Sequence, residues 1–150
     1  MLDIFKASVI HTWPYDRPLL ACRFDPLGRY VLTSAENNLL QRFSMADGTI
    51  QTLPLQHESW CQALAISPDG NIAISGGGDG RLIWWDMQAD PPTSIRSIDA
   101  HTDFVRSISI NPTGNLLVSG GYDRAVHLWH ASTGDLVRTF KKHEINVYCV

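Results

Sequence analysis

One internal repeat constrains the fold of this chain more than any other feature. The prolines Pro26, Pro68 and Pro112 lie 42 and then 44 residues apart, and each is followed two residues later by a glycine (FDPLG, ISPDG, INPTG). The same offsets link three further series: Thr33, Ser75 and Ser119; Phe43, Trp85 and Trp129; and Tyr15, His57, His101 and His143. The chain is therefore one structural unit repeated three times, with a fourth unit beginning.

Each unit is predicted to contain four short strands. Segments such as CQALAIS and VRSISIN are followed by a Pro-x-Gly turn and then by the apolar segments IAIS and LLVS. Proline presets φ in such a turn and glycine accepts a positive φ. Two more segments complete the unit, for example RLIWW and SIRSI, or AVHLW and LVRTF. Four strands per unit, repeated along the chain, indicate the blades of a β-propeller.

These residues resemble the WD-repeat β-propeller family over nearly the whole chain. The resemblance rests on a His at the start of each unit, a Ser on the second strand, an Asp in the next turn and a Trp that ends the third strand. The dipeptide that names the family is Trp85-Asp86, which becomes Trp129-His130 and Phe43-Ser44 in the other units.

The resemblance implies an all-β fold, a WD-repeat β-propeller segment of four-stranded antiparallel blades with three complete blades and partial strands at both ends. The expected segments are 1–14 (outer strand of a preceding blade), 15–56 (repeat 1, degenerate), 57–100 (repeat 2), 101–142 (repeat 3) and 143–150 (first strand of a truncated repeat 4).

Two units carry the residue types of a catalytic triad. A hydrolase needs a Ser activated by a His, which an Asp orients. However, the set recurs at constant spacing, whereas chemistry normally needs one site, and a Trp accompanies each set with an N–H that needs a buried acceptor. In the resembled family these positions form a hydrogen-bonded chain from Trp to Ser to His to Asp. The resemblance thus implies structural tetrads and no catalytic residue; the tetrads are His57, Ser75, Asp79 and Trp85, and His101, Ser119, Asp123 and Trp129.

The first unit has Tyr15, Thr33, Asn37 and Phe43 at the tetrad positions. These residues could keep part of a polar network but cannot make a triad, because no Ser, His and Asp occur together.

The resemblance also implies a docking surface. WD-repeat proteins often bind partners where the loop before each first strand meets the turn between the second and third strands, a surface called the rim below. The candidate partner-binding residues there are Asp16, Glu36, Glu58, Trp60, Thr102, Phe104, Tyr122, Glu144 and Asn146. Aromatic anchors among carboxylates, with no Lys or Arg in the set, suit a protein or peptide segment that carries Lys or Arg. The alternative is that Trp60 and Phe104 only pack between blades.

The glycine-rich stretch SGGGDGRLIWWD, residues 75–86, allows a phosphate loop, a calcium loop or a turn. Arg81 occupies the last Gly position of a GxGxxG pattern counted from Gly76, and Asp79 falls on a required Gly of the calcium repeat GGxGxD. The equivalent stretches TSAENNLLQRFS and SGGYDRAVHLWH lack most of the glycines. The stretch is therefore predicted to be a turn between two strands.

Composition limits the remaining classes of function. A formal net charge of −3 and the lack of a basic stripe disfavour nucleic acid, and no apolar run approaches the ~18 residues of a membrane span. The N-terminus is a poor secretory signal, so a cytoplasmic protein is expected. Cys22, Cys61 and Cys149 form no CxxC pair and are expected to be free thiols buried in strands.

Neither a metal nor another cofactor is expected. His127 and His130 flank Trp129, but their spacing alone is weak evidence for a metal site.

The sequence therefore predicts a non-catalytic scaffold for protein–protein interaction. The main alternative is part of a propeller-containing enzyme or regulatory protein whose catalytic site lies outside this segment. Because the terminal strands have no middle strands to pair through, a fragment of a longer propeller is expected, ahead of a half-propeller that pairs with another chain through its open blade edges.

Overall fold

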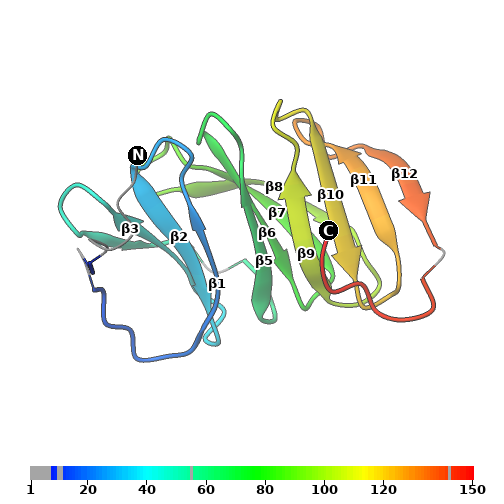
Figure 1. The fold of residues 1–150 in the computed structure, drawn as a ribbon, viewed down its shortest axis with the longest axis horizontal. Helices are drawn as coiled ribbons and strands as arrows, with labels where there is room; N and C mark the ends of the chain where they lie inside the picture. Colours follow the sequence, from blue (N-terminus) through cyan, green and yellow to red (C-terminus); the bar gives the residue numbers. More distant parts are fainter. Residues whose placement is uncertain (1–7, 10–11, 55, 142) are drawn as a thin grey trace.

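The computed structural model describes residues 8–9, 12–54, 56–141 and 143–150. In this part of the chain, three four-stranded antiparallel sheets form, and each uses four strands that are consecutive in the sequence (Figure 1). The first sheet contains β1 (Leu19–Phe24), β2 (Tyr30–Ala35), β3 (Leu40–Ser44) and β4 (Ile50–Thr52). The second contains β5 (Cys61–Ile66), β6 (Ile72–Gly77), β7 (Arg81–Asp86) and β8 (Thr93–Asp99). The third contains β9 (Val105–Ile110), β10 (Leu116–Gly121), β11 (Val126–His130) and β12 (Leu136–Phe140).

The fold class predicted from the repeat is confirmed. The three sheets stand next to one another as blades, and the first strands β1, β5 and β9 lie side by side (Figure 1). The predicted Pro-x-Gly turns are present, because Gly28, Gly70 and Gly114 have φ values of 71°, 69° and 76°. The described residues form no helix that could cross a membrane.

The hydrophobic core lies between the blades rather than within one blade. Strand β7 has an unbroken run of apolar residues, Leu82 to Trp85, and its packing explains this run. Its side chains alternate, so that Leu82 and Trp84 pack toward the third blade while Ile83 and Trp85 pack toward the first. Because both faces of this strand are buried, the usual polar alternation disappears. The two adjacent tryptophans therefore belong to two different cores.

Neither predicted partial strand is seen among the described residues at the two ends of the chain. Most of the segment 1–14 lies outside the described residues, and the described part forms no strand. Within it, the Trp13 ring lies 5.7 Å from the ring of Phe43 in the first blade.

The segment 143–150 also forms no strand, since it has no neighbouring strand of its own blade among the described residues to make a ladder with. It nevertheless continues the repeat. A Cβ on Gly120 would lie 2.6 Å from Val147, just as a Cβ on Gly76 would lie 2.6 Å from Val105.

The expectation that all three cysteines are buried is wrong for two of them. Cys61 is buried, whereas Cys22 and Cys149 are exposed. Cys22 corresponds to Leu64, which packs against the preceding blade, and Cys149 corresponds to Ala63, which packs against the following blade. The described residues contain no blade before the first or after the third, so these two thiols face solvent.

Candidate functional site

In the second blade the four tetrad side chains form one continuous chain of hydrogen bonds. The Trp85 indole N–H donates to Ser75 Oγ at 2.9 Å, and Ser75 Oγ lies 2.7 Å from His57 Nε2. His57 Nδ1 lies 3.1 Å from both carboxylate oxygens of Asp79. The chain joins β7, β6, the loop before β5 and the turn after β6.

The third blade repeats this geometry almost atom for atom. Trp129 Nε1 lies 2.9 Å from Ser119 Oγ, which lies 2.8 Å from His101 Nε2. His101 Nδ1 lies 2.9 and 3.0 Å from the two oxygens of Asp123. The constant spacing in the sequence thus corresponds to a constant arrangement in space.

The direction of these hydrogen bonds follows from the tryptophan. An indole N–H can only donate a hydrogen bond, so Ser75 Oγ accepts one from Trp85. The Ser75 hydroxyl in turn donates a hydrogen bond to His57 Nε2. His57 therefore carries its proton on Nδ1 and donates it to Asp79. Every polar side-chain atom of the tetrad therefore takes part in a hydrogen bond.

The tetrad serines are not accessible to a substrate in this structure. Ser75 and Ser119 are both 0% exposed. A nucleophile must reach the scissile carbonyl beside an oxyanion hole. The arrangement therefore has the residue types and hydrogen bonds of a catalytic triad, but its serine is not exposed to a substrate.

Both tetrad aspartates have a pKa below the ordinary value of the group. Burial alone would raise the pKa of Asp79, but hydrogen bonds from His57 and from the backbone N–H groups of Glu58 and Arg81 together lower it. The same balance, with His101 as the side-chain donor, lowers the pKa of Asp123. The carboxylates are thus held as fixed acceptors at the ends of both chains.

The first blade keeps only the outer half of this arrangement. Asn37 Nδ2 donates to the Tyr15 hydroxyl at 3.0 Å. Phe43 stands where the other blades have tryptophan and has no N–H to donate. The inner half of the chain, from the third strand to the second, is therefore absent in this blade.

The structure brings the two kinds of rim position together by a backbone hydrogen bond in each blade. The N–H of Glu36, Gly78 or Tyr122 donates to the carbonyl of Pro18, Trp60 or Phe104 at 3.1, 2.8 and 2.9 Å respectively. This bond ties the turn between the second and third strands to the loop before the first. Of the predicted rim residues, Asp16, Glu36, Glu58, Thr102 and Glu144 are exposed, and Asn146 is half-buried.

Three aromatic rings form a row across this surface. The rings of Phe104 and Tyr122 lie 5.8 Å apart, and those of Tyr122 and Tyr148 lie 5.5 Å apart, both edge to face. Tyr148 is 57% exposed. Phe104, Tyr122 and Tyr148 are called the aromatic row below.

Phe104 and Trp60 occupy equivalent positions but lie differently. The Phe104 ring packs directly on Gly78 of the second blade, where a Cβ would collide with it. The position equivalent to Gly78 in the first blade is Glu36, whose side chain prevents the same packing of Trp60. Trp60 accordingly remains 47% exposed.

The rim is less uniformly acidic than its sequence set indicates. Glu58 forms an ion pair with Arg81, with 3.2 Å between Oε1 and Nη1, and Arg81 also lies 3.4 Å from Asp99. For Asp16, Glu36 and Glu144 the structure shows no ion pair with another described residue. These three carboxylates are therefore the ones free to meet a cationic partner.

Sequence reasoning missed one more set of inward-facing positions. Each first strand has a β-bulge, with the register shifting between Leu19 and Ala21, between Cys61 and Ala63, and opposite Val105 and Ser107. A bulge re-aims the extra side chain. The three bulged residues and Tyr148, at the equivalent position of the fourth unit, line one cavity of about 420 Å³; the bulged residues are Leu20, Gln62 and Arg106.

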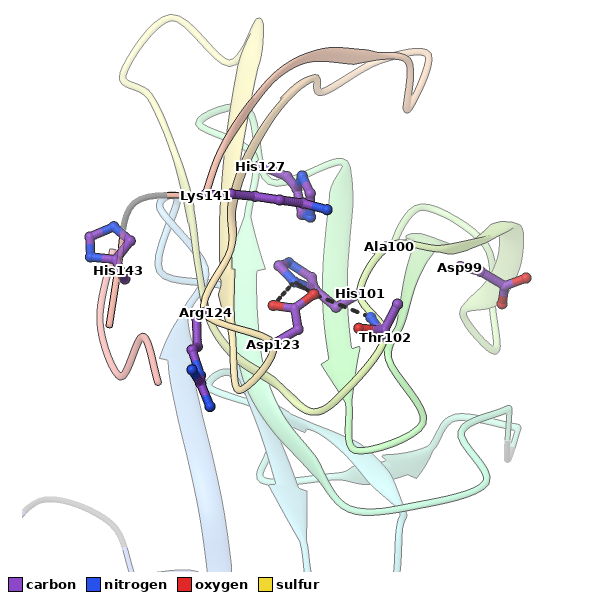
Figure 2. Close-up of a pocket in the computed structure, with 9 residues that line it drawn as sticks. All are labelled: Asp99, Ala100, His101, Thr102, Asp123, Arg124, His127, Lys141 and His143. Carbon is purple, nitrogen blue, oxygen red and sulfur yellow. Dashed lines mark hydrogen bonds and ion pairs between the residues drawn. The ribbon is translucent and has the colours of Figure 1, made fainter. Parts of the chain in front are cut away.

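A second cavity, of about 470 Å³, opens over the tetrad of the third blade (Figure 2). Beyond His101 and Asp123 it is lined by His127, Lys141 and His143, among others. His127 is 8% exposed, and its ring centroid lies 4.5 Å from that of His101. Burial, together with the neighbouring His101 and Lys141, lowers the pKa of His127.

Stacked four-stranded antiparallel blades tied by a Trp-Ser-His-Asp chain define a segment of a β-propeller. Residues 47–86 and 92–130, together more than half of the chain, match the family model described as WD domain, G-beta repeat. The chain belongs to this WD-repeat family.

Curated relatives extend the comparison. Transducin-like enhancer protein 2 of Mus musculus is 29% identical over 90 residues, which cover 59% of this chain and 12% of that protein. Small ribosomal subunit protein RACK1 of Neurospora crassa is 31% identical over 63 residues, 42% of this chain and 20% of that protein. An uncharacterized WD repeat-containing protein of Schizosaccharomyces pombe is 20% identical over 142 residues, 89% of this chain and 38% of that protein.

Solved structures show the same fold. The crystal structure of the RRP9 WD40 repeats and the structure of U3-55K each superpose with a TM-score of 0.84 at 20% identity. Each superposition covers 91% of this chain, and 42% and 43% of the two solved chains respectively. The chain thus spans less than half the length of each of these relatives.

Proposed function

We propose that this chain is a non-catalytic scaffold that binds a protein partner on its rim. The observation that carries the proposal is the aromatic row, which lies on the face that also presents the half-exposed indole of Trp60. Exposed aromatic side chains held by a rigid framework are the usual anchors of protein interfaces. WD-repeat domains typically bind protein partners, which agrees with this surface.

The partner's chemistry follows from the charges around these rings. The carboxylates of Asp16, Glu36 and Glu144 have no counter-ion among the described residues. A Lys or Arg side chain can pair with such a carboxylate and stack on a neighbouring ring. We therefore assign the rim to an extended segment of a partner protein that carries Lys or Arg.

The role of the tetrads in this proposal is structural. They fix the loop before each first strand against the turn after each second strand, which are the two segments that make up the rim. We further propose that this chain is one portion of a longer propeller in the cytoplasm. Its coverage of less than half of each solved relative supports the first part of that statement.

Selection from a random peptide library displayed on phage tests the proposal. We expect the protein to enrich peptides with Lys or Arg, and the Trp60→Ala variant to lose that enrichment without a change in its unfolding midpoint. Phe24→Ala is the matched control, because Phe24 is also exposed, at 68%, but lies at the other end of its strand. Enrichment of acidic peptides, or undiminished enrichment by Trp60→Ala, would show that the rim is not the binding site.

A further inference from the structure

The third blade differs from the second at one buried position next to its tetrad. His127 on β11 corresponds to Ile83 on β7, and both are buried, at 8% and 1% exposure. The apolar Ile83 belongs to the core between the first and second blades. His127 instead brings a third potential metal ligand next to His101 and Asp123.

The three side chains converge. One ligand atom from each of His101, Asp123 and His127 can be chosen so that all three atoms lie within 4.8 Å of one another. Figure 2 shows His127 above the hydrogen-bonded pair of His101 and Asp123 in that view, and all three residues line the same cavity. Two imidazoles and a carboxylate form a donor set that suits Zn²⁺, with a fourth position open to water.

The outer contacts hold these ligands in suitable orientations. His127 Nδ1 lies 2.8 Å from Thr139 Oγ1, which leaves Nε2 directed to the cavity. The oxygens of Asp123 accept the backbone N–H groups of Thr102 and Ala125 at 3.2 and 3.1 Å. In metal sites, hydrogen bonds from neighbouring groups to the ligands hold the ligands in the orientation that binds the metal.

We propose that His101, Asp123 and His127 form a binding site for a divalent ion such as Zn²⁺. Among the described blades, only the third has this site. The ion replaces the proton that His101 Nδ1 donates to Asp123, and by exchange with the solvent the ring gains a proton on Nε2 as it loses the one on Nδ1. The His101 ring then carries its proton on Nε2 and donates it to Ser119 Oγ, which has lone pairs for this donor and for Trp129. Binding thus converts a hydrogen bond of the tetrad into a metal bridge, with a change of tautomer at His101 and no net loss of a proton from its ring.

Lys141 is the competing cation at this site. It lines the same cavity and influences His127 electrostatically. Its side chain is long and flexible and its residue is exposed, so that it can withdraw to solvent when the ion binds.

Titration with Zn²⁺ by calorimetry, and with Co²⁺ by visible absorption, tests the site on the full chain. We expect one Zn²⁺ per chain and Co²⁺ bands of tetrahedral intensity. The His127→Ile variant restores the residue of the second blade and should keep its unfolding midpoint. It should weaken Zn²⁺ binding by more than about tenfold.

Two further variants keep the test decisive. Thr139→Val removes the contact that orients His127 and should weaken binding about tenfold even if His127→Ile folds poorly. His130→Ala removes an exposed histidine of the same strand and should leave binding unchanged. The proposal is overturned if the protein binds no Zn²⁺, if His127→Ile and Thr139→Val bind as tightly as the unchanged chain, or if His130→Ala abolishes binding.

Discussion

At the scale of single residues, the tetrad aspartate is the anchor of each chain of hydrogen bonds. Asp79 accepts from His57 and from two backbone N–H groups, those of Glu58 and Arg81. One carboxylate therefore fixes the imidazole, the loop before β5 and the turn before β7. This explains why an acid recurs at this position in the second and third blades while other turn residues vary.

We expect Asp79→Asn to destabilise the protein at pH 7 by about 1.5–3 kcal/mol, because a buried charge-assisted hydrogen bond is lost. The folded-state pKa of Asp79 lies below its unfolded value of 3.8. Its contribution is therefore fully present above the unfolded pKa and disappears as the pH falls through the folded pKa. The stability gap between the two proteins should narrow from pH 5 to pH 2, as measured by urea unfolding.

Asp135→Asn provides the control, because Asp135 is exposed. This change should alter stability by less than about 0.5 kcal/mol at every pH. A gap for Asp79→Asn that stays constant on acidification would contradict the assigned role of the carboxylate.

Some residue-level features follow from the sequence and others do not. The tetrad positions recur at fixed offsets, and the resemblance to the WD-repeat family implies that Ser75 and Trp85 lie beside His57. The exposure of Trp60 has no such signal, because it depends on whether the facing turn residue has a Cβ. That contact joins two blades and cannot be inferred from either position alone.

At the scale of elements, a side chain on the third strand of one blade donates a hydrogen bond to a backbone carbonyl of the next blade. This hydrogen bond, called the clasp below, occurs at both blade junctions among the described residues. Trp84 Nε1 donates to the carbonyl of Ala131 at 2.7 Å, and Arg42 Nη1 donates to the equivalent carbonyl of Met87 at 2.9 Å. An indole in one blade and a guanidinium in the neighbouring blade therefore donate equivalent hydrogen bonds to the next blade. Leu128 occupies this position in the third blade and has no donor.

We expect Trp84→Phe to destabilise the protein by about 1–3 kcal/mol, since the buried carbonyl of Ala131 loses its donor while most of the apolar contact remains. Trp60→Phe is the matched control and should change stability by less than about 0.5 kcal/mol, because that indole is half exposed. Urea unfolding midpoints of both variants measure the difference. Equal effects of the two substitutions would exclude the clasp.

The strands themselves were predictable, whereas their bulges were not. Branched residues, Pro-x-Gly turns and the repeat together identify four strands per blade. The bulged positions carry Leu20, Gln62 and Arg106, which share no chemical property. A bulge is set by the hydrogen-bond register between two strands, so its position leaves no pattern of residue types in one strand.

At the scale of the whole molecule, the outer face of the third blade carries apolar side chains without a described neighbour. Val118 and Leu128 are equivalent to Ile74 and Trp84, which are buried between the second and third blades. On the third blade the same positions are only half buried. Together with Leu116 they border an apolar cavity of about 190 Å³ on the outer face.

The repeat predicts this situation, because a unit that buries its faces only against its neighbours leaves the outermost faces uncovered. The repeat therefore accounts for the blades, the stacking of the blades and the recurrence of the tetrad positions.

Uncovered faces of this kind should associate. We expect sedimentation velocity of the chain to show a weight-average mass that rises with protein concentration, because apolar faces and open sheet edges pair between copies. Leu128→Glu places a charge in the outer face of the third blade and should lower that association without moving the unfolding midpoint, since it removes no contact between described blades. His130→Glu, an exposed change on the same strand, should leave the association unchanged. A monomer at every concentration would show instead that the outer faces are tolerated by the isolated chain, and equal effects of the two substitutions would assign any association to net charge rather than to this face.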